Sequence, residues 1–139
     1  MIQLILHLWG DYLTQSDWMA QNKTKRWFPA ISHATVYSLP FLLIGSPLAV
    51  LVIWATHAVI DRFRLARYLC WAKNWIAPWE TRWIAEARGF HKIPPNWPWK
   101  DCKATGYEPG CPVWMATWLM IIADNTLHLT INYMALRWL

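Results

Sequence analysis

A long stretch without charged side chains constrains this chain more than any other feature of its sequence. Between Arg26 and Asp61 lie 34 residues with no Asp, Glu, Lys or Arg. As a single helix they would extend roughly 50 Å, well beyond the roughly 30 Å hydrocarbon core of a bilayer. The stretch must therefore fold back on itself. Gly45-Ser46-Pro47 supplies the break, because proline cannot continue a helix.

The composition indicates a membrane protein. Hydrophobic residues make up 56% of the chain and charged residues 15%, against roughly 45–50% and 25% in soluble domains. The 13 Trp residues are typical of a membrane interface, where the ring meets lipid and the N–H meets water. We therefore expect an all-α, integral membrane bundle of about four transmembrane helices, forming a single membrane domain over residues 1–139. The expected spans are 2–20, 28–44, 47–64 and 112–136.

The positive charges predict an orientation. Lys and Arg cluster at residues 23–26 and 62–73, and none lies in the turn at 45–47. The positive-inside rule places both clusters in the cytoplasm, together with a Pro- and Trp-rich insert at 74–111 between the third and fourth spans. The chain has a net charge of +5. Its Lys and Arg residues flank apolar runs, so we expect anionic membrane lipid as the partner and no nucleic acid. The expected location is the bacterial inner (cytoplasmic) membrane.

Seven candidate metal ligands interrupt the apolar segments. Six of them form pairs at i,i+4 spacing, which places both side chains of a pair on one face of a helix. The pairs are His7 with Asp11, His57 with Asp61, and Asp124 with His128, and His33 is the seventh residue. Counted at about 1.5 Å per residue from the cytoplasmic ends, all seven reach similar depths. Imidazole and carboxylate ligands suit Zn, Mn, Fe or Ni, and we expect one or two divalent ions, zinc first.

Other interpretations of these residues remain open. A lone buried His often only accepts a hydrogen bond, a His–Asp pair can clamp two helices, and Asp/His chains can conduct protons or ions. Three pairs favour a metal, because each carboxylate buried in a membrane costs about 2.5–3.5 kcal/mol. Two metals could clamp a phosphoester, and Asp61 or Asp11 could act as the general base.

Three basic residues lie at the expected cytoplasmic rim of this site. Arg62, Arg64 and Lys23 could hold a phosphate or lipid headgroup, although basic residues at this position are more commonly determinants of topology. The sequence alone does not separate these two roles.

The order of these residues resembles a known family. The shared pattern runs His7-x3-Asp11-x3-Gln15-x-Asp17-Trp18-Met19-Ala20-x2-Lys23, then His33, then His57-x3-Asp61-x2-Arg64, then Asp124-Asn125-x2-His128. It is similar to a family of small bacterial and phage integral membrane proteins known only as a domain of unknown function. That family is similar in turn to inner-membrane proteins described as metal-dependent hydrolases. The resemblance covers the four spans and not the insert, and Asn125 departs from the Gln expected there.

Three functions from different classes follow from these observations. The first is a membrane-embedded, metal-dependent hydrolase that acts on an amphiphilic substrate containing a phosphoester. The second is a phage or bacterial membrane factor that binds or blocks a host membrane component, with a structural metal. The third is an ion or proton pathway. A homodimer or a host membrane protein would be the protein partner. The word hydrolase rests on the resemblance alone.

Overall fold

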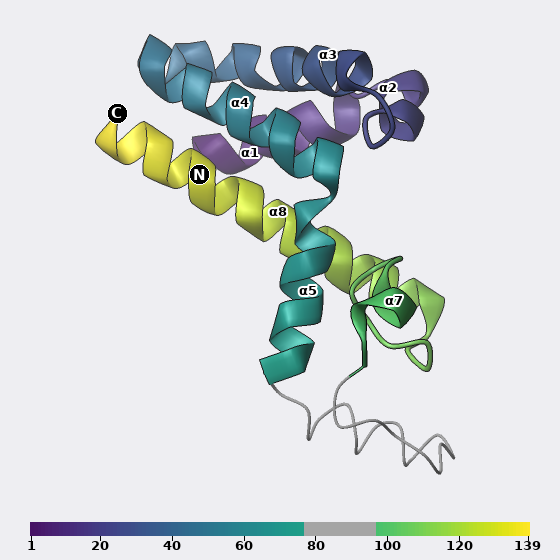
Figure 1. The fold of residues 1–139 in the computed structure, drawn as a ribbon. Helices are drawn as coiled ribbons and strands as arrows, with labels where there is room; N and C mark the ends of the chain where they lie inside the picture. Colours follow the sequence, from purple (N-terminus) through teal and green to yellow (C-terminus); the bar gives the residue numbers. More distant parts are fainter. Residues whose placement is uncertain (77–96) are drawn as a thin grey trace. The chain divides into compact units, whose positions relative to one another are not determined.

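The computed structural model describes residues 1–76 and 97–139, and this part of the chain is all-α, as the sequence predicted. Its seven α-helices (Figure 1) are α1 (Ile2–Leu8), α2 (Asp17–Asn22), α3 (Trp27–Ser38), α4 (Pro47–Phe63), α5 (Leu65–Ile76), α7 (Trp99–Cys102) and α8 (Val113–Trp138). Two short turns accompany them, the π-helical η1 (Trp9–Leu13) and the 3-10 helical η2 (Leu39–Leu43).

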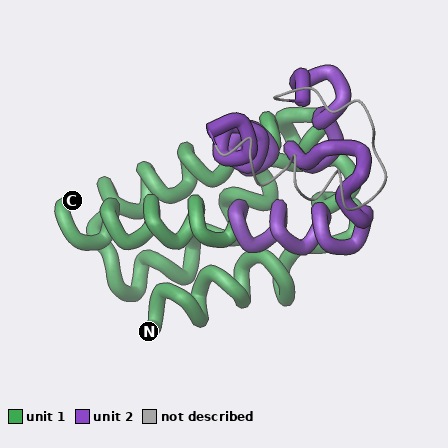
Figure 2. The backbone as a smooth tube through the Cα atoms, turned by 90° about the horizontal axis from the view of Figure 1, so that it is seen from below, with its two compact units in different colours: residues 1–64, 125–139 green, residues 65–124 purple. Residues whose placement is uncertain are grey.

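The described chain divides into two compact units (Figure 2). Unit 1 contains Met1–Arg64 and Asn125–Leu139, and unit 2 contains Leu65–Asp124. Helix α8 therefore contributes its second half to unit 1 and its first half to unit 2. The sequence predicted one membrane domain. The predicted insert at 74–111 belongs to unit 2, and its residues 77–96 lie outside the described residues.

Two of the predicted helices have nearly the expected bounds. Helix α4 begins after Ser46, whose side-chain oxygen accepts a hydrogen bond from the Ala49 amide at 3.1 Å, and Pro47 occupies the first turn. It ends at Arg64, which adopts a left-handed conformation with φ of 51°. The expected helix at 112–136 corresponds to α8.

The other two expected helices are interrupted. Residues 2–20 do not form one helix, because α1 gives way to η1 and α2 starts afresh after Ser16. The Ser16 hydroxyl caps α2 by accepting from the Met19 amide at 3.3 Å. Residues 28–44 begin as α3 and tighten into η2, where Pro40 has no N–H to continue the α-helical pattern.

Across residues 1–76 and 97–139, no helix is both long enough and apolar enough to cross a membrane. Helix α4 has 17 residues, about 25 Å of helix. Helix α8 has 26 residues but carries Asp124, Asn125 and His128 within its length. The structure therefore does not show the four membrane-crossing helices that the sequence predicted.

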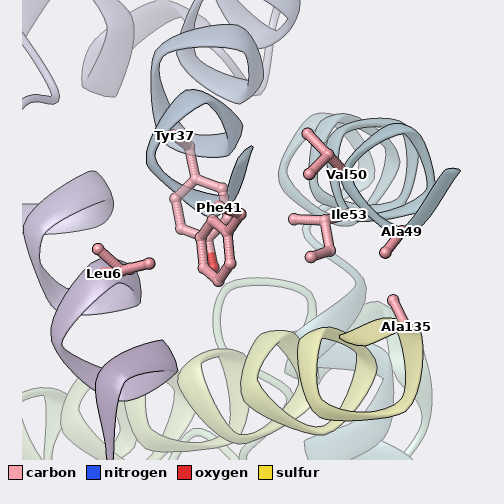
Figure 3. Close-up of a cluster of buried hydrophobic side chains, with 7 residues drawn as sticks. All are labelled: Leu6, Tyr37, Phe41, Ala49, Val50, Ile53 and Ala135. Carbon is pink, nitrogen blue, oxygen red and sulfur yellow. The ribbon is translucent and has the colours of Figure 1, made fainter. Parts of the chain in front are cut away.

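Unit 1 has a small apolar core beside a polar interior. Figure 3 shows this core, in which side chains from α1, α3, η2, α4 and α8 meet. Its members are Leu6, Tyr37, Phe41, Ala49, Val50, Ile53 and Ala135. Ala30 and Ala34 on α3 are also fully buried, and such small side chains allow neighbouring helix backbones to approach closely.

Unit 1 differs from a typical soluble domain in which of its side chains are buried. Four histidines, Asp61 and Asn132 are buried. Large apolar side chains instead lie on the outer faces of the same helices, including Ile5, Phe28, Leu43, Leu51 and Tyr133. Leu43 is 83% exposed and Phe28 is 73% exposed. Unit 1 therefore buries polar side chains and leaves many large apolar side chains exposed.

Candidate metal centre

Five potential metal ligands from four elements converge inside unit 1. Asp11 lies in η1, His33 on α3, His57 and Asp61 on α4, and His128 on the second half of α8. The three histidines and Asp61 are buried, and the side chain of Asp11 is 11% exposed. The ligand atoms form two groups, one of Asp11, His33 and His57 and one of His57, Asp61 and His128. Within each group they lie within 4.8 Å of one another.

The separations between these atoms match those of ligands around one ion. His33 Nε2 lies 3.2 Å from Asp11 Oδ1 and 3.3 Å from Asp61 Oδ2. His57 Nε2 lies 3.5 Å and 3.2 Å from the same two oxygens. Ligand atoms about 2.0–2.1 Å from a tetrahedral metal are about 3.4 Å apart. His128 Nε2 lies slightly further out, 3.7 Å from Asp61 Oδ1.

These close approaches are not aligned as hydrogen bonds. Among the described residues, Asp11 Oδ1 and the Nε2 atoms of His33 and His57 have no hydrogen-bond partner, although all are buried. Buried polar atoms are normally paired, because an unpaired one costs about 1–3 kcal/mol. Buried imidazole and carboxylate atoms that lie this close together without hydrogen-bond partners are an arrangement that a cation would satisfy.

Lys23 contacts this cluster directly. Its Nζ lies 2.9 Å from Asp61 Oδ2, and its side chain is 18% exposed. The sequence placed Lys23 at a lipid headgroup, whereas the structure pairs it with a candidate ligand. With neutral imidazoles, two carboxylates and one ammonium leave one negative charge in the cluster, which favours a further cation.

His7 serves the cluster through hydrogen bonds. Its Nδ1 lies 2.8 Å from the Tyr37 hydroxyl and its Nε2 lies 3.1 Å from Asn125 Oδ1. The Tyr37 oxygen also accepts from Asn132 Nδ2 at 2.7 Å, and the Tyr37 ring stacks on His57 with centroids 3.7 Å apart. Both ring nitrogens of His7 are thus engaged, and neither group of candidate ligands includes His7.

The face of α8 that meets the cluster differs from the predicted one. Asn125, His128 and Asn132 each contribute to the site or its hydrogen bonds. Because helix residues are about 100° apart, Asp124 lies about 40° to one side of His128 and Asn132 about 40° to the other. Asp124 is in neither ligand group. Its charge acts within unit 2, where burial raises the pKa of the Cys70 thiol and Asp124 adds to that rise.

The two arginines have structural contacts. Arg62 Nη1 donates to the Thr24 carbonyl at 2.7 Å, and its guanidinium lies over the rings of Trp27 and Phe63. It therefore fixes the turn that carries Lys23. Arg64 ends α4 through its left-handed conformation.

Sequence reasoning missed Tyr37 and the two asparagines because they carry no charge. A usable signal was present, since Tyr37 follows His33, and Asn132 follows His128, at the same i,i+4 spacing. Extending the search from ionisable to all polar side chains in the apolar segments would have found both.

The fold and this cluster define an all-α protein with buried His/Asp groups that could hold a metal ion. The family described as "Protein of unknown function (DUF3307)" matches residues 1–81, more than half of the chain, and the chain belongs to this family. The match includes Asp11, His33, His57 and Asp61, whereas His128 lies beyond it. No curated protein and no solved structure matches the chain. Membership confirms the resemblance to a family of unknown function, and its membrane and hydrolase parts stay predictions.

Proposed function

We propose that this protein is a metal-dependent hydrolase of the bacterial cytoplasmic membrane, acting on an amphiphilic substrate with a phosphoester. The convergence of three histidines and two aspartates inside unit 1 carries the proposal. Three separate helices and a π-helical turn must be positioned to bring these side chains together. Their buried, misaligned contacts have no evident stabilising role without a cation.

The donor set favours zinc. Imidazole and carboxylate ligands suit Zn, Mn, Fe and Ni, and each group offers three protein ligands. Three ligands leave a fourth position for water or substrate, as in catalytic zinc sites. The groups share His57, whose Nε2 has one lone pair, so that nitrogen can ligate only one ion. Asp61 could contribute a ligand to either group, because its Oδ2 lies near His33 and His57 and its Oδ1 lies near His128.

The two carboxylates have different environments and so different proposed roles. Asp61 is buried and already meets Lys23, which suits a ligand that stays ionised. Asp11 is the more exposed of the two, and its Oδ1 is the candidate ligand atom, so we assign its other oxygen, Oδ2, as the general base. A divalent ion would supply a Lewis acid that polarises the phosphoryl oxygen and activates water.

The outer surface of unit 1 supports a lipid environment. Its apolar side chains face outward on α1, α3, α4 and α8, while its histidines, Asp61 and Asn132 are buried inside. A bilayer favours this arrangement, because lipid cannot hydrogen-bond to polar groups. The proposed orientation keeps the clusters at 23–26 and 62–73 on the cytoplasmic side, following the distribution of positive charge.

Elemental analysis of the detergent-purified chain tests the proposal, with Asp61→Asn as the variant. This change keeps the side-chain volume and removes the charge. We expect one or two divalent ions per chain in the wild type. Loss of a ligand should weaken metal binding at least about tenfold, since even outer hydrogen-bond partners contribute 10–100-fold. The matched control is Asp101→Asn, an exposed aspartate of unit 2.

The outcomes separate the three functions. Absence of metal from wild-type protein prepared without chelator would contradict the metal centre and favour an ion or proton pathway. Metal retention with no phosphoester hydrolysis, and with loss of stability alone in Asp61→Asn, would favour a structural metal in a binding protein. Metal content and hydrolysis falling together would support the hydrolase.

A further inference from the structure

We propose that Lys23 and the divalent ion compete for the same oxygen, Asp61 Oδ2, and that the ion releases the Lys23 ammonium to bind an anionic phosphoryl group. This inference rests on the proposed function and names a substrate-binding residue for it. Its starting observation is that Lys23 Nζ lies 2.9 Å from Asp61 Oδ2.

Of the two Asp61 oxygens, Oδ2 is the one that lies near both His33 and His57. Asp61 Oδ2 also lies 3.3 Å from His33 Nε2 and 3.2 Å from His57 Nε2. An ion held by those two nitrogens would draw on this oxygen, and its charge would repel an ammonium at the same place. Coulomb repulsion between a divalent ion and an ammonium a few ångströms apart is large in a buried site. The ion therefore weakens the pair between Lys23 and Asp61.

The side chain of Lys23 can move while its backbone stays fixed. Lys23 follows the last residue of α2, and Arg62 holds the adjoining Thr24 carbonyl at 2.7 Å. Asp61 and Arg62 are consecutive on α4, so one helix end binds two consecutive residues of the turn. The Lys23 side chain is 18% exposed and has a flexible four-carbon stem, so its ammonium can leave Asp61 without unfolding the turn.

The released ammonium would lie at the partly exposed edge of the metal centre. Asp11, whose side chain is 11% exposed, lies close to the same His33 nitrogen as Asp61. Lys is a common phosphate binder, acting as a point charge. This placement favours an anionic substrate, because a negatively charged oxygen is attracted by both the divalent ion and the ammonium.

Two binding measurements on the full-length, detergent-purified chain test the inference, with zinc and inorganic phosphate as the probes. Lys23→Met removes the competing cation, so zinc should bind at least about fivefold more tightly, the lower end of typical coupling between sites. Phosphate binding to the zinc-loaded protein should weaken by a similar factor. Lys25→Met is the matched control, since Lys25 is an exposed lysine in the same turn and should change neither affinity.

A second variant guards against misfolding. Lys23→Gln retains a hydrogen-bond donor to Asp61 and removes the charge, and it should shift both affinities in the same directions. Unchanged zinc affinity in both variants would overturn the competition. Tighter zinc with unchanged phosphate binding would overturn the substrate role. Failure of wild-type protein to bind zinc would instead contradict the metal centre itself.

Discussion

At the scale of single residues, Tyr37 connects the histidines to one another. Its hydroxyl bridges His7 Nδ1 and Asn132 Nδ2, and its ring stacks on His57. The hydroxyl and the ring of Tyr37 are both buried, because the whole side chain is inaccessible to solvent. Tyr37 therefore fixes the orientation of the candidate ligand His57. Mutating such supporting contacts typically weakens metal affinity about 10–100-fold.

Removing this hydroxyl should be costly. Tyr37→Phe would leave buried polar atoms of His7 and Asn132 unpaired, and we expect the free energy of unfolding to fall by about 1–3 kcal/mol. Denaturant unfolding of the detergent-solubilised protein measures this loss. Tyr12→Phe is the control, because Tyr12 bonds Asn125 but is 54% exposed, so water can replace its hydroxyl. Equal losses in the two variants would contradict the bridging role of Tyr37.

At the scale of elements, the π-helical turn η1 decides where Asp11 points. A π-turn holds an extra residue in the helical repeat, which rotates the residues that follow, and such turns are frequent at functional sites. His7 and Asp11 are thus not a simple i,i+4 helical pair. Asp11 Oδ2 lies 3.5 Å from His7 Nδ1, while Asp11 Oδ1 meets His33 and His57 on other helices.

Gly10 makes this turn compatible with the core. A Cβ atom at Gly10 would overlap the ring of Tyr37, which is buried and cannot move aside. Gly10→Ala should therefore destabilise the protein by about 1–3 kcal/mol, the usual cost of overpacking. It should also weaken zinc binding, because the displaced ring stacks on His57.

Gly45→Ala provides the comparison for Gly10→Ala. Its added methyl would lie 2.6 Å from the end of the Leu136 side chain, which is flexible and can shift. Thermal unfolding and zinc titration of both variants check the prediction. A Gly10→Ala protein with wild-type stability and zinc affinity would show that η1 tolerates a side chain and does not position Asp11.

At the scale of the whole molecule, the outward apolar surface of unit 1 is the dominant feature. No helix in the described residues meets the requirements for crossing a membrane, yet large apolar side chains cover the outside of α1, α3, α4 and α8. We predict that alkaline carbonate extraction leaves the protein in the membrane pellet, because burial of this surface in lipid removes apolar area from water. Recovery in the carbonate supernatant would contradict membrane embedding and leave the metal centre unaffected.

The sequence by itself determined the helical class and the pair His57 and Asp61. Both follow from local periodicity, since α4 is a regular helix with clear start and stop signals and i,i+4 residues share its face. The bounds of α8 were equally readable, because Pro112 and the apolar run that follows are local signals. His33 was chosen because ligating residues are rare in apolar segments, and His128 was chosen because it lies four residues after Asp124.

Only the tertiary structure decided which neighbours those residues meet. The sequence predicted that Asp124 and His128 both face the site. In the structure Asn125 and Asn132 face it together with His128, because a small rotation of α8 exchanges adjacent positions. The tertiary structure also brought Lys23 to Asp61 across 38 residues of chain, beside the bond from Arg62 to Thr24. Local patterns report which side chains share one helix face. Contacts between elements depend on how several helices pack at once, which no single segment encodes.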